Sequence, residues 1–341
     1  MTTPASPKIL TTVVGSYPAP DWLVALPSQQ ALIDATSVVF KIQELAGIDV
    51  VADGELYRFD INHPDTNGMI EYFVRPLGGV RSQIGRNDVT AFSKIAAMKF
   101  RSRPAAVVEG PITEGTLDLV GDYQRARFLT ERRMKFTVTG PHMLSRTLLD
   151  HHYKKPAEIA MALAQVLASQ ITQIEADVLQ IDEANITGAP EDADWAVPAL
   201  NHVLDAIRGE KALHLCFGNY GGQTIQQGAW RRLIHFMNQL RVDHVVLEMA
   251  RRDLKEIESL KDLNPRIGIG LGVIDIKSTV VESADEVSRR IEQAENILGQ
   301  GRIHYVHPDC GFWMLKRSIA DRKIRALVEG RNRYLGSAPN G

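Results

Sequence analysis

Two side chains that can bind a metal stand two residues apart in the segment ALHLCFGNY, residues 212–220. The segment is short and mostly apolar, so we expect a strand in which His214 and Cys216 point to the same side. Imidazole nitrogen and thiolate sulfur are donors that zinc prefers. The chain has one other cysteine, Cys310, at the end of a similar segment, IHYVHPDCG. The sequence therefore raises the question of whether these three residues converge on one metal.

Composition narrows the classes of protein to consider. The chain has 341 residues, of which 44% are apolar and 23% charged, and its formal net charge is −2. This balance is typical of a globular protein with a large core, and it indicates no nucleic-acid or membrane surface. The N-terminus does not resemble a signal peptide, and no window is apolar for long enough to span a bilayer. We expect a cytoplasmic protein whose two cysteines are ligands, a nucleophile or core residues rather than a disulfide.

One pattern recurs along the chain: a short β-branched run, then polar or glycine-rich residues, then a segment with helical periodicity. The candidate strands are Leu10–Val14, Asp49–Ala52, Lys135–Thr139, Val178–Ile181, Leu213–Phe217, His244–Leu247, Ile267–Val273 and Ile303–His307. The candidate helices are Ser28–Ala46, Pro156–Ala176, Trp195–Ile207, Thr224–Leu240, Leu254–Leu260, Ala284–Leu298 and a last one near Met314–Glu329. Eight strands alternating with helices predict an α/β fold, a TIM (β/α)8 barrel formed by residues 1–341 as one domain. A doubly wound open sheet is the alternative.

One interval is too long for an ordinary barrel connection. Residues 55–134 separate the second and third candidate strands and contain a turn signal, DINHPDTNG. We expect a hairpin or small sheet here, with a helix near Gly121–Arg132. This insertion either lies over one mouth of the barrel as a lid or has no role at the site.

Polar side chains recur where the candidate strands end. In a TIM barrel the active site forms at the C-terminal ends of the strands and in the loops that follow them, so these residues are candidates for it. They are Gly15, Ser16, Asp53, Glu55, Gly140, Asp182, Glu183, His214, Cys216, Glu248, Asp275, Lys277, Asp309 and Cys310.

Four of these residues form a candidate zinc site: His214, Cys216, Glu248 and Cys310. They come from the fifth, sixth and eighth strands, and their donor types satisfy tetrahedral zinc. One alternative is that each is ordinary, because a buried cysteine packs as a small hydrophobe and a strand-end histidine is often only hydrogen-bonded. Another is a structural zinc. Ligands dispersed over almost a hundred residues, one of them a carboxylate that can yield to substrate, favour a catalytic zinc.

Eight motifs between residues 11 and 311 occur in the order of a known family. They are TTVVGSYP (Thr11–Pro18), DGELYRFD (Asp53–Asp60), TVTGP (Thr137–Pro141), QIDEA (Gln180–Ala184), HLC (His214–Cys216), VVLEMARRD (Val245–Asp253), GVIDIKS (Gly272–Ser278) and HPDCG (His307–Gly311). Together they resemble the C-terminal, catalytic half of cobalamin-independent methionine synthase and related single-barrel zinc thiol-alkyltransferases. HLC or HPDCG alone would be a weak signal, whereas the ordered set is specific.

The resemblance implies a function and a set of site residues. It implies that the four candidate ligands hold Zn²⁺, and that a methyl group moves onto the thiol of homocysteine, through a zinc-bound thiolate, to form methionine. Ser16, Glu55 and Asp182 match positions that hold the homocysteine carboxylate and ammonium groups. The alternative for the two acids is that they cap a helix or pair with a nearby arginine.

The chain departs from the folate-using enzymes of this family in one motif. They carry a histidine where DIKS has Lys277, so we take Lys277 and Asp275 as the candidate catalytic residues. Lys277 would be an acid if burial lowers its pKa, or it would bind an anionic group of a substrate. The family's tryptophan segment for stacking folate is not recognisable in residues 55–134. The methyl donor therefore stays open between a folate, a methylated corrinoid protein and a simpler methyl compound.

Two other functions remain in consideration. An alkyltransferase of the epoxyalkane–coenzyme M type would activate a different thiol, and a non-catalytic zinc or small-molecule binding protein would activate none. Glu55 and Asp182 would repel the sulfonate of coenzyme M, so they favour an amino-acid thiol. We therefore rank methionine formation first.

Overall fold

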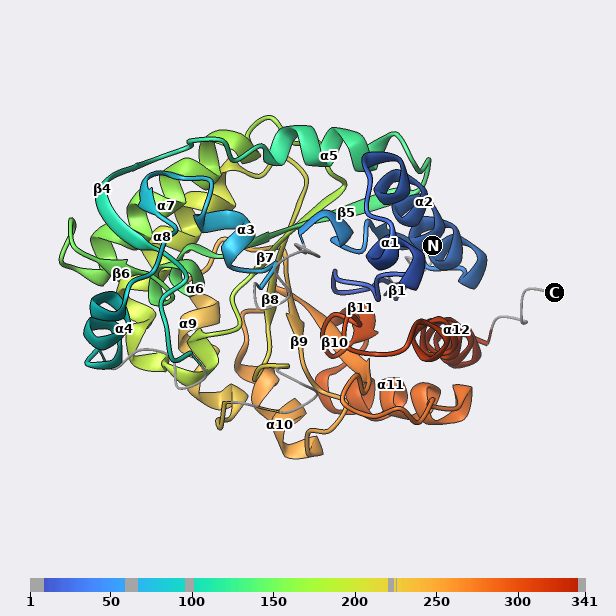
Figure 1. The fold of residues 1–341 in the computed structure, drawn as a ribbon. Coiled ribbons are helices and arrows are strands. Elements are labelled where there is room, and N and C mark those ends of the chain that lie inside the picture. Colours follow the sequence, from blue (N-terminus) through green and yellow to red (C-terminus); the bar gives the residue numbers. More distant parts are fainter. Residues whose placement is uncertain (1–8, 59–66, 96–100, 220–223, 225, 337–341) are drawn as a thin grey trace.

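The centre of the molecule is a parallel sheet of eight strands that curls into a nearly closed barrel (Figure 1). The structure is a computed structural model that describes residues 9–58, 67–95, 101–219, 224 and 226–336. The barrel strands are β1 Leu10–Thr11, β2 Val50–Ala52, β5 Arg133–Thr139, β7 Val178–Asp182, β8 Glu210–Leu215, β9 His244–Leu247, β10 Gly268–Ile274 and β11 Ile303–Pro308. Their order is β1, β11, β10, β9, β8, β7, β5, β2, and a parallel bridge between Thr12 and Val50 links the two ends of the sheet. The predicted TIM barrel is confirmed, in place of an open doubly wound sheet.

Helices surround the barrel (Figure 1). They are α1 Asp21–Ala25, α2 Gln29–Ala46, α6 Pro141–Arg146, α7 Pro156–Ile171, α8 Ala193–Ala206, α9 Ile234–Asn238, α10 Leu254–Ser259, α11 Ala284–Leu298 and α12 Arg317–Tyr334, with short 3-10 turns η2 Ile186–Gly188, η3 Pro190–Asp192, η4 Trp230–Arg232 and η5 Leu260–Asp262. Helix α11 begins where predicted because Ser283 and Glu286 form a reciprocal capping box. Helix α2 ends at Gly47, whose φ of 85° suits glycine.

The predicted helix Thr224–Leu240 is wrong. In the described part of this interval only η4 and α9 are helical. The chain before them runs as a loop against the end of β8, where the backbone N–H of Gln226 donates to the carbonyl of Phe217 at 2.9 Å. The apolar periodicity of the sequence is satisfied by two short helical turns as well as by one long helix.

The connection from β2 to β5 carries its own elements. They are η1 Leu56–Arg58, α3 Glu71–Val74, β3 Gly78–Arg81, α4 Arg86–Ser93, β4 Val107–Thr113 and α5 Leu119–Arg127. The expected small sheet and helix are present. The sheet also takes a parallel strand, β6 Leu149–Asp150, from beyond the predicted interval. Of the predicted turn DINHPDTNG, residues 60–66 lie outside the described residues.

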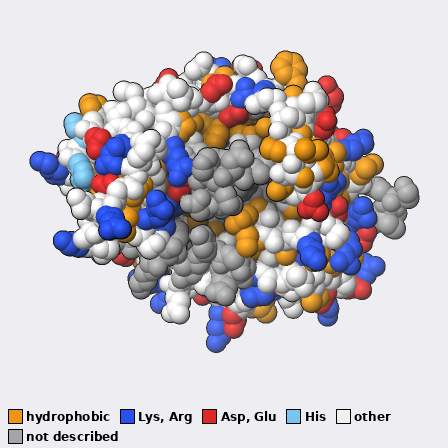
Figure 2. Space-filling view, viewed as in Figure 1, with side chains coloured by type: hydrophobic (Ala, Val, Ile, Leu, Met, Phe, Trp, Pro, Cys, Tyr) orange, Lys and Arg blue, Asp and Glu red, His pale blue; other side chains and the backbone are white. Residues whose placement is uncertain are grey.

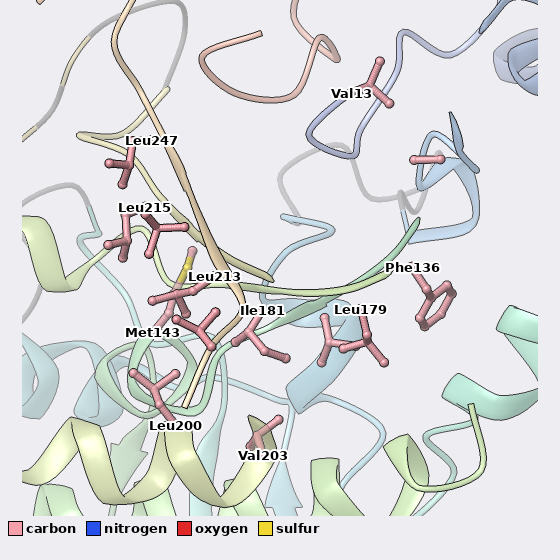
Figure 3. Packing of buried hydrophobic residues seen from close by; sticks show 14 of the residues in the cluster. Val13, Phe136, Met143, Leu179, Ile181, Leu200, Val203, Leu213, Leu215 and Leu247 are labelled. Carbon is pink, nitrogen blue, oxygen red and sulfur yellow. The ribbon is translucent and has the colours of Figure 1, made fainter. Parts of the chain in front are cut away.

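Alternation along the strands separates the core from the site. Leu179 and Leu213 face outward and belong to the same hydrophobic cluster as Leu200 of α8 (Figure 3). Side chains alternate along a strand, so Asp182 and His214 point to the opposite, inner face. A separate apolar cluster fills the interior: Val14, Val50, Val178, Ala212, Val246 and Tyr305. Asp182 and His214 lie on this inner face toward the carboxyl ends of β7 and β8.

Within the described ranges, no helix combines the length and the apolar character that a bilayer crossing requires.

Candidate active site

His214, Cys216 and Cys310 meet at the C-terminal mouth of the barrel. One donor atom of each lies within 4.8 Å of the other two, and the two Sγ atoms are 4.0 Å apart. His214 Nδ1 lies 3.1 Å from the carbonyl oxygen of Val246, a distance at which Nδ1–H donates and Nε2 keeps its lone pair. Nε2 is buried and has no hydrogen-bond partner among the described residues. This donor set fits zinc, because two sulfurs and one free imidazole nitrogen converge with room for a fourth ligand.

The two thiols lie within hydrogen-bond distance of each other. The hydrogen bond between the thiols and the positive charge of the nearby His214 hold the pKa of Cys216 well below its usual range, although burial opposes this. The same hydrogen bond, together with burial, raises the pKa of Cys310 well above its usual range. The pKa of His214 is raised by the adjacent Cys216, although burial opposes the rise. A thiolate facing an imidazole is suited to binding a cation.

Glu248 lies next to this cluster but is engaged elsewhere. Its Oε1 is 2.7 Å from Lys277 Nζ, and its Oε2 accepts the backbone N–H of Phe217 at 3.0 Å. The side chains of Glu248 and Lys277 are 3% and 1% exposed, so the ion pair is shielded from water. The structure therefore brings three of the four candidate ligands together and places Glu248 beside them.

A cavity opens above the cluster. Its lining contains six of the predicted site residues: Ser16, Glu55, Asp182, His214, Cys216 and Cys310. The other lining residues are Val14, Gly15, Asn67, Met69, Met143, Ala184, Asn185, Gly218, Asn219, Gln226, Gly311 and Trp313. In the space-filling view, hydrophobic side chains gather mainly in the upper right part of the visible face, and Lys and Arg side chains are scattered over the rest of it (Figure 2).

Glu55 is held in the cavity wall by its own buried partners. Its Oε1 accepts the hydroxyl of Thr137 at 2.6 Å and lies 3.4 Å from Arg58 Nη1. Gly15 makes this approach possible, because a Cβ at that position would lie 2.1 Å from Glu55 Oε1. The backbone of Glu55 has a φ of 58°, a left-handed conformation that a non-glycine residue rarely adopts. The carboxylate of Glu55 is thus placed in the cavity wall by a backbone conformation that is strained.

Asp182 supplies a second carboxylate to the same cavity. Its Oδ1 accepts the side-chain amide of Gln180 at 2.7 Å. Burial raises the pKa of Asp182 to about 7, and the charge of Glu55 contributes, while His214 opposes the rise. Ser16 closes the site from the β1 side, and its backbone carbonyl accepts the N–H of Phe312. Two buried carboxylates and a hydroxyl therefore face one space.

Asp275 is not brought together with the other predicted residues. Its carboxylate accepts Arg251 Nε at 2.7 Å and the backbone N–H of Lys277 at 2.8 Å. It lines a different surface cavity, beside Glu282 and Arg290. Asp275 orders the loop that carries Lys277, but it does not line the cavity beside the His214, Cys216 and Cys310 cluster.

Several residues of the site were not singled out from the sequence. Asn67, Met69, Met143, Asn185, Asn219, Gln226 and Trp313 line the cavity. Most lie in loops, where periodicity gives no signal. Asp309 was noted only as a strand-end residue. Its Oδ1 accepts the backbone N–H groups of Met249 and Ala250, each at 2.8 Å, which fixes the chain just after Glu248.

Fold and cavity together place the chain among TIM-barrel proteins whose site lies at the carboxyl ends of the strands. The family model described as cobalamin-independent synthase, catalytic domain, matches residues 9–332, and the chain belongs to this family.

Individual relatives agree in length with this chain. The methionine synthase of Thermococcus kodakarensis is 28% identical over 343 residues, which cover 95% of this chain and 93% of the relative. That of Saccharolobus solfataricus is 26% identical over 340 residues, with 95% and 94% covered.

Two solved structures share the fold. A B12-independent methionine synthase from Shewanella sp. W3-18-1, in complex with selenomethionine, has a TM-score of 0.78 at 23% identity, with 96% of this chain and 98% of that chain covered. A methyltransferase from Methanosarcina mazei has a TM-score of 0.61 at 12% identity, with 96% and 94% covered. At these identities the likeness bears on the fold alone.

Proposed function

We propose that this protein is a zinc-dependent methyltransferase that moves a methyl group onto the thiol of homocysteine and so forms methionine. The observation that carries the proposal is the shared cavity, in which the cluster of His214, Cys216 and Cys310 lies with two buried carboxylates. Membership of the cobalamin-independent synthase family and the methionine synthases among the relatives support it.

His214, Cys216 and Cys310 would hold the zinc, with Glu248 as a fourth ligand that substrate displaces. Bound zinc would supply the positive charge that keeps a substrate thiol deprotonated at neutral pH, where a free thiol with a pKa near 8.5 is mostly protonated. Val246 fixes the tautomer of His214 so that Nε2 faces the cluster.

The carboxylates would recognise the amino-acid end of the substrate. A buried ammonium group requires anionic acceptors, which Glu55 and Asp182 provide. The hydroxyl of Ser16 would donate to the substrate carboxylate. The same two acids would repel a sulfonate, so coenzyme M is a poorer substrate in this cavity.

Lys277 would control the position of Glu248. In the structure Lys277 Nζ holds one oxygen of Glu248, and the Phe217 N–H holds the other. We infer that Lys277 Nζ and the Phe217 N–H bind the Glu248 carboxylate after the substrate thiol has displaced it from the zinc. Asp275 would then contribute only by fixing the backbone of Lys277.

The segment between β2 and β5 would cover the substrate. Asn67 and Met69, both from this segment, line the cavity, which supports a lid role for residues 55–134. A single barrel domain with this lid is the domain organisation that we propose. The methyl donor stays open between a folate, a methylated corrinoid protein and a simpler methyl compound.

Calorimetric titration of zinc-loaded protein with homocysteine tests the proposal. Titrations in two buffers of different ionisation enthalpy measure proton release, and about one proton per bound thiol is expected. Coenzyme M serves as the matched thiol with a sulfonate and no ammonium group. Heat and proton release with coenzyme M but not with homocysteine would contradict the proposal. Methyl donors are then screened with homocysteine as acceptor, and methionine is the product to be measured.

A further inference from the structure

A buried cation, Lys135, has no part in the proposed chemistry yet lies close to it. Lys135 is on β5 and is 1% exposed. Its neighbour Phe136 packs in the outer hydrophobic cluster, so alternation directs Lys135 into the barrel (Figure 3). Burial lowers its pKa to about 7, because the ammonium form loses its hydration. Burying an ammonium group costs free energy, so a lysine at this position is expected to have hydrogen-bond partners that offset the cost.

Lys135 forms the first link of a short chain of hydrogen bonds. Its Nζ donates to Gln180 Oε1 at 2.8 Å and to the carbonyl oxygen of Val13 at 2.9 Å. Gln180 Nε2 in turn donates to Asp182 Oδ1 at 2.7 Å and to the carbonyl oxygen of Val14 at 2.9 Å. The three side chains linked by these hydrogen bonds are buried, with exposures of 1%, 0% and 3% for Lys135, Gln180 and Asp182.

The first link determines the direction of the second. A lysine ammonium group has only donors, so the amide oxygen of Gln180 must face Lys135 and its NH₂ group must face Asp182. With the amide turned round, two donors would meet at Lys135 and two oxygens would meet at Asp182. Lys135 at the oxygen end and the Val14 carbonyl at the NH₂ end therefore together fix the orientation of the Gln180 amide.

We propose that Lys135 is a positioning residue for the ammonium-binding side of the cavity, acting through Gln180 to hold the carboxylate of Asp182 toward the substrate. The inference rests on the proposed function, because it takes Asp182 as a partner of the homocysteine ammonium group. Glu55 has separate support from Thr137 and Arg58. Each carboxylate thus has its own buried cation, and loss of Lys135 affects one side of the pocket.

The role predicts a selective defect. Without Lys135 the buried Oε1 of Gln180 loses its donor, so the amide is held at its NH₂ end alone and supports the carboxylate of Asp182 less firmly. Thiols that carry an ammonium group then lose a partner, whereas thiols without one are unaffected.

Three thiols separate this role from a structural one. Homocysteine has ammonium and carboxylate groups, 3-aminopropane-1-thiol has only the ammonium group, and 4-mercaptobutanoate has only the carboxylate. Calorimetry on the zinc-loaded full chain measures their affinities in wild type, Lys135→Met and Gln180→Glu. Gln180→Glu is isosteric and keeps an acceptor for Lys135, but it turns an oxygen toward Asp182. Tyr305→Phe is the control, because it removes a buried hydroxyl that bonds Glu210 near the other end of the barrel.

Both test variants should bind homocysteine and 3-aminopropane-1-thiol at least about tenfold more weakly than wild type, since a hydrogen bond to a charged group is lost. Their affinity for 4-mercaptobutanoate should stay within about twofold, and Tyr305→Phe should bind all three normally. Unchanged homocysteine affinity, or an equal loss for all three thiols, would overturn the inference. A wild-type protein that binds 4-mercaptobutanoate but not homocysteine would instead refute the proposed function.

Discussion

The ion pair between Lys277 and Glu248 gives a prediction about stability. The two charges are 2.7 Å apart and almost fully shielded from water. At an effective dielectric constant of about 20, Coulomb's law gives about 6 kcal/mol of attraction, much of which desolvation of the two groups offsets. Removing one partner leaves the other charge buried alone. Lys277→Met should therefore lower the free energy of unfolding of the metal-free protein by about 3 to 5 kcal/mol.

A double-mutant cycle isolates this interaction. Glu248→Gln removes the charge but keeps an acceptor, and the double variant removes both charges. We expect the double variant to recover most of the stability that Lys277→Met loses, because no unpaired charge remains. Urea denaturation followed by fluorescence, with chelator present, measures all four proteins.

A surface ion pair provides the matched control. Lys261 and Glu258 are 3.8 Å apart and more than half exposed. Lys261→Met should change the free energy of unfolding by less than about 1 kcal/mol. The reasoning is refuted if Lys277→Met is as stable as wild type, or if the double variant is no more stable than Lys277→Met.

Three further predictions concern the pocket, the metal and pH. Asp182→Asn should weaken homocysteine binding by about ten- to a hundredfold without loss of zinc, as calorimetry and metal analysis would show, and wild-type affinity would count against the pocket. Removing zinc with a chelator should lower the midpoint of thermal unfolding of wild type but not of His214→Ala, and equal responses would exclude His214 as a ligand. Burial raises the pKa of Asp53 from 3.8 to about 6, so its contribution to stability is complete below pH 4 and is lost as the pH rises to about 6. The loss amounts to about 3 kcal/mol. In urea denaturation from pH 4 to 7, metal-free Asp53→Asn should lack this part of the pH dependence, and a slope equal to that of wild type would contradict the assignment.

The barrel and the convergence of His214, Cys216 and Cys310 could be predicted because both depend on local signals. Short β-branched runs bounded by polar residues predict strands, and parallel strands place their carboxyl ends at one mouth. His214 and Cys216 share an inner face by alternation alone. Cys310 follows from the same rule applied to the eighth strand. No contact between distant residues was needed for these steps.

The rest depends on contacts between segments that are far apart in the sequence. The spacing of Glu248 and Lys277 does not show that their side chains meet, because α10 and η5 lie between their strands in the sequence. In the sequence Lys135 is only one polar residue of a predicted strand. Its hydrogen bond to Gln180 is evident only from the packed interior of the barrel. The strand β6 was not predicted because its partner is β4, from which β5 separates it in the sequence.

We propose that His214, Cys216 and Cys310 hold a zinc ion to which the substrate thiol binds in place of Glu248. X-ray absorption spectroscopy at the zinc edge measures this by counting sulfur neighbours. We predict two sulfurs, from Cys216 and Cys310, in the zinc-loaded protein and three after homocysteine is added. The Cys310→Ser variant should show one fewer in each state if it retains zinc. A sulfur count that stays at two after saturation with homocysteine would contradict the account.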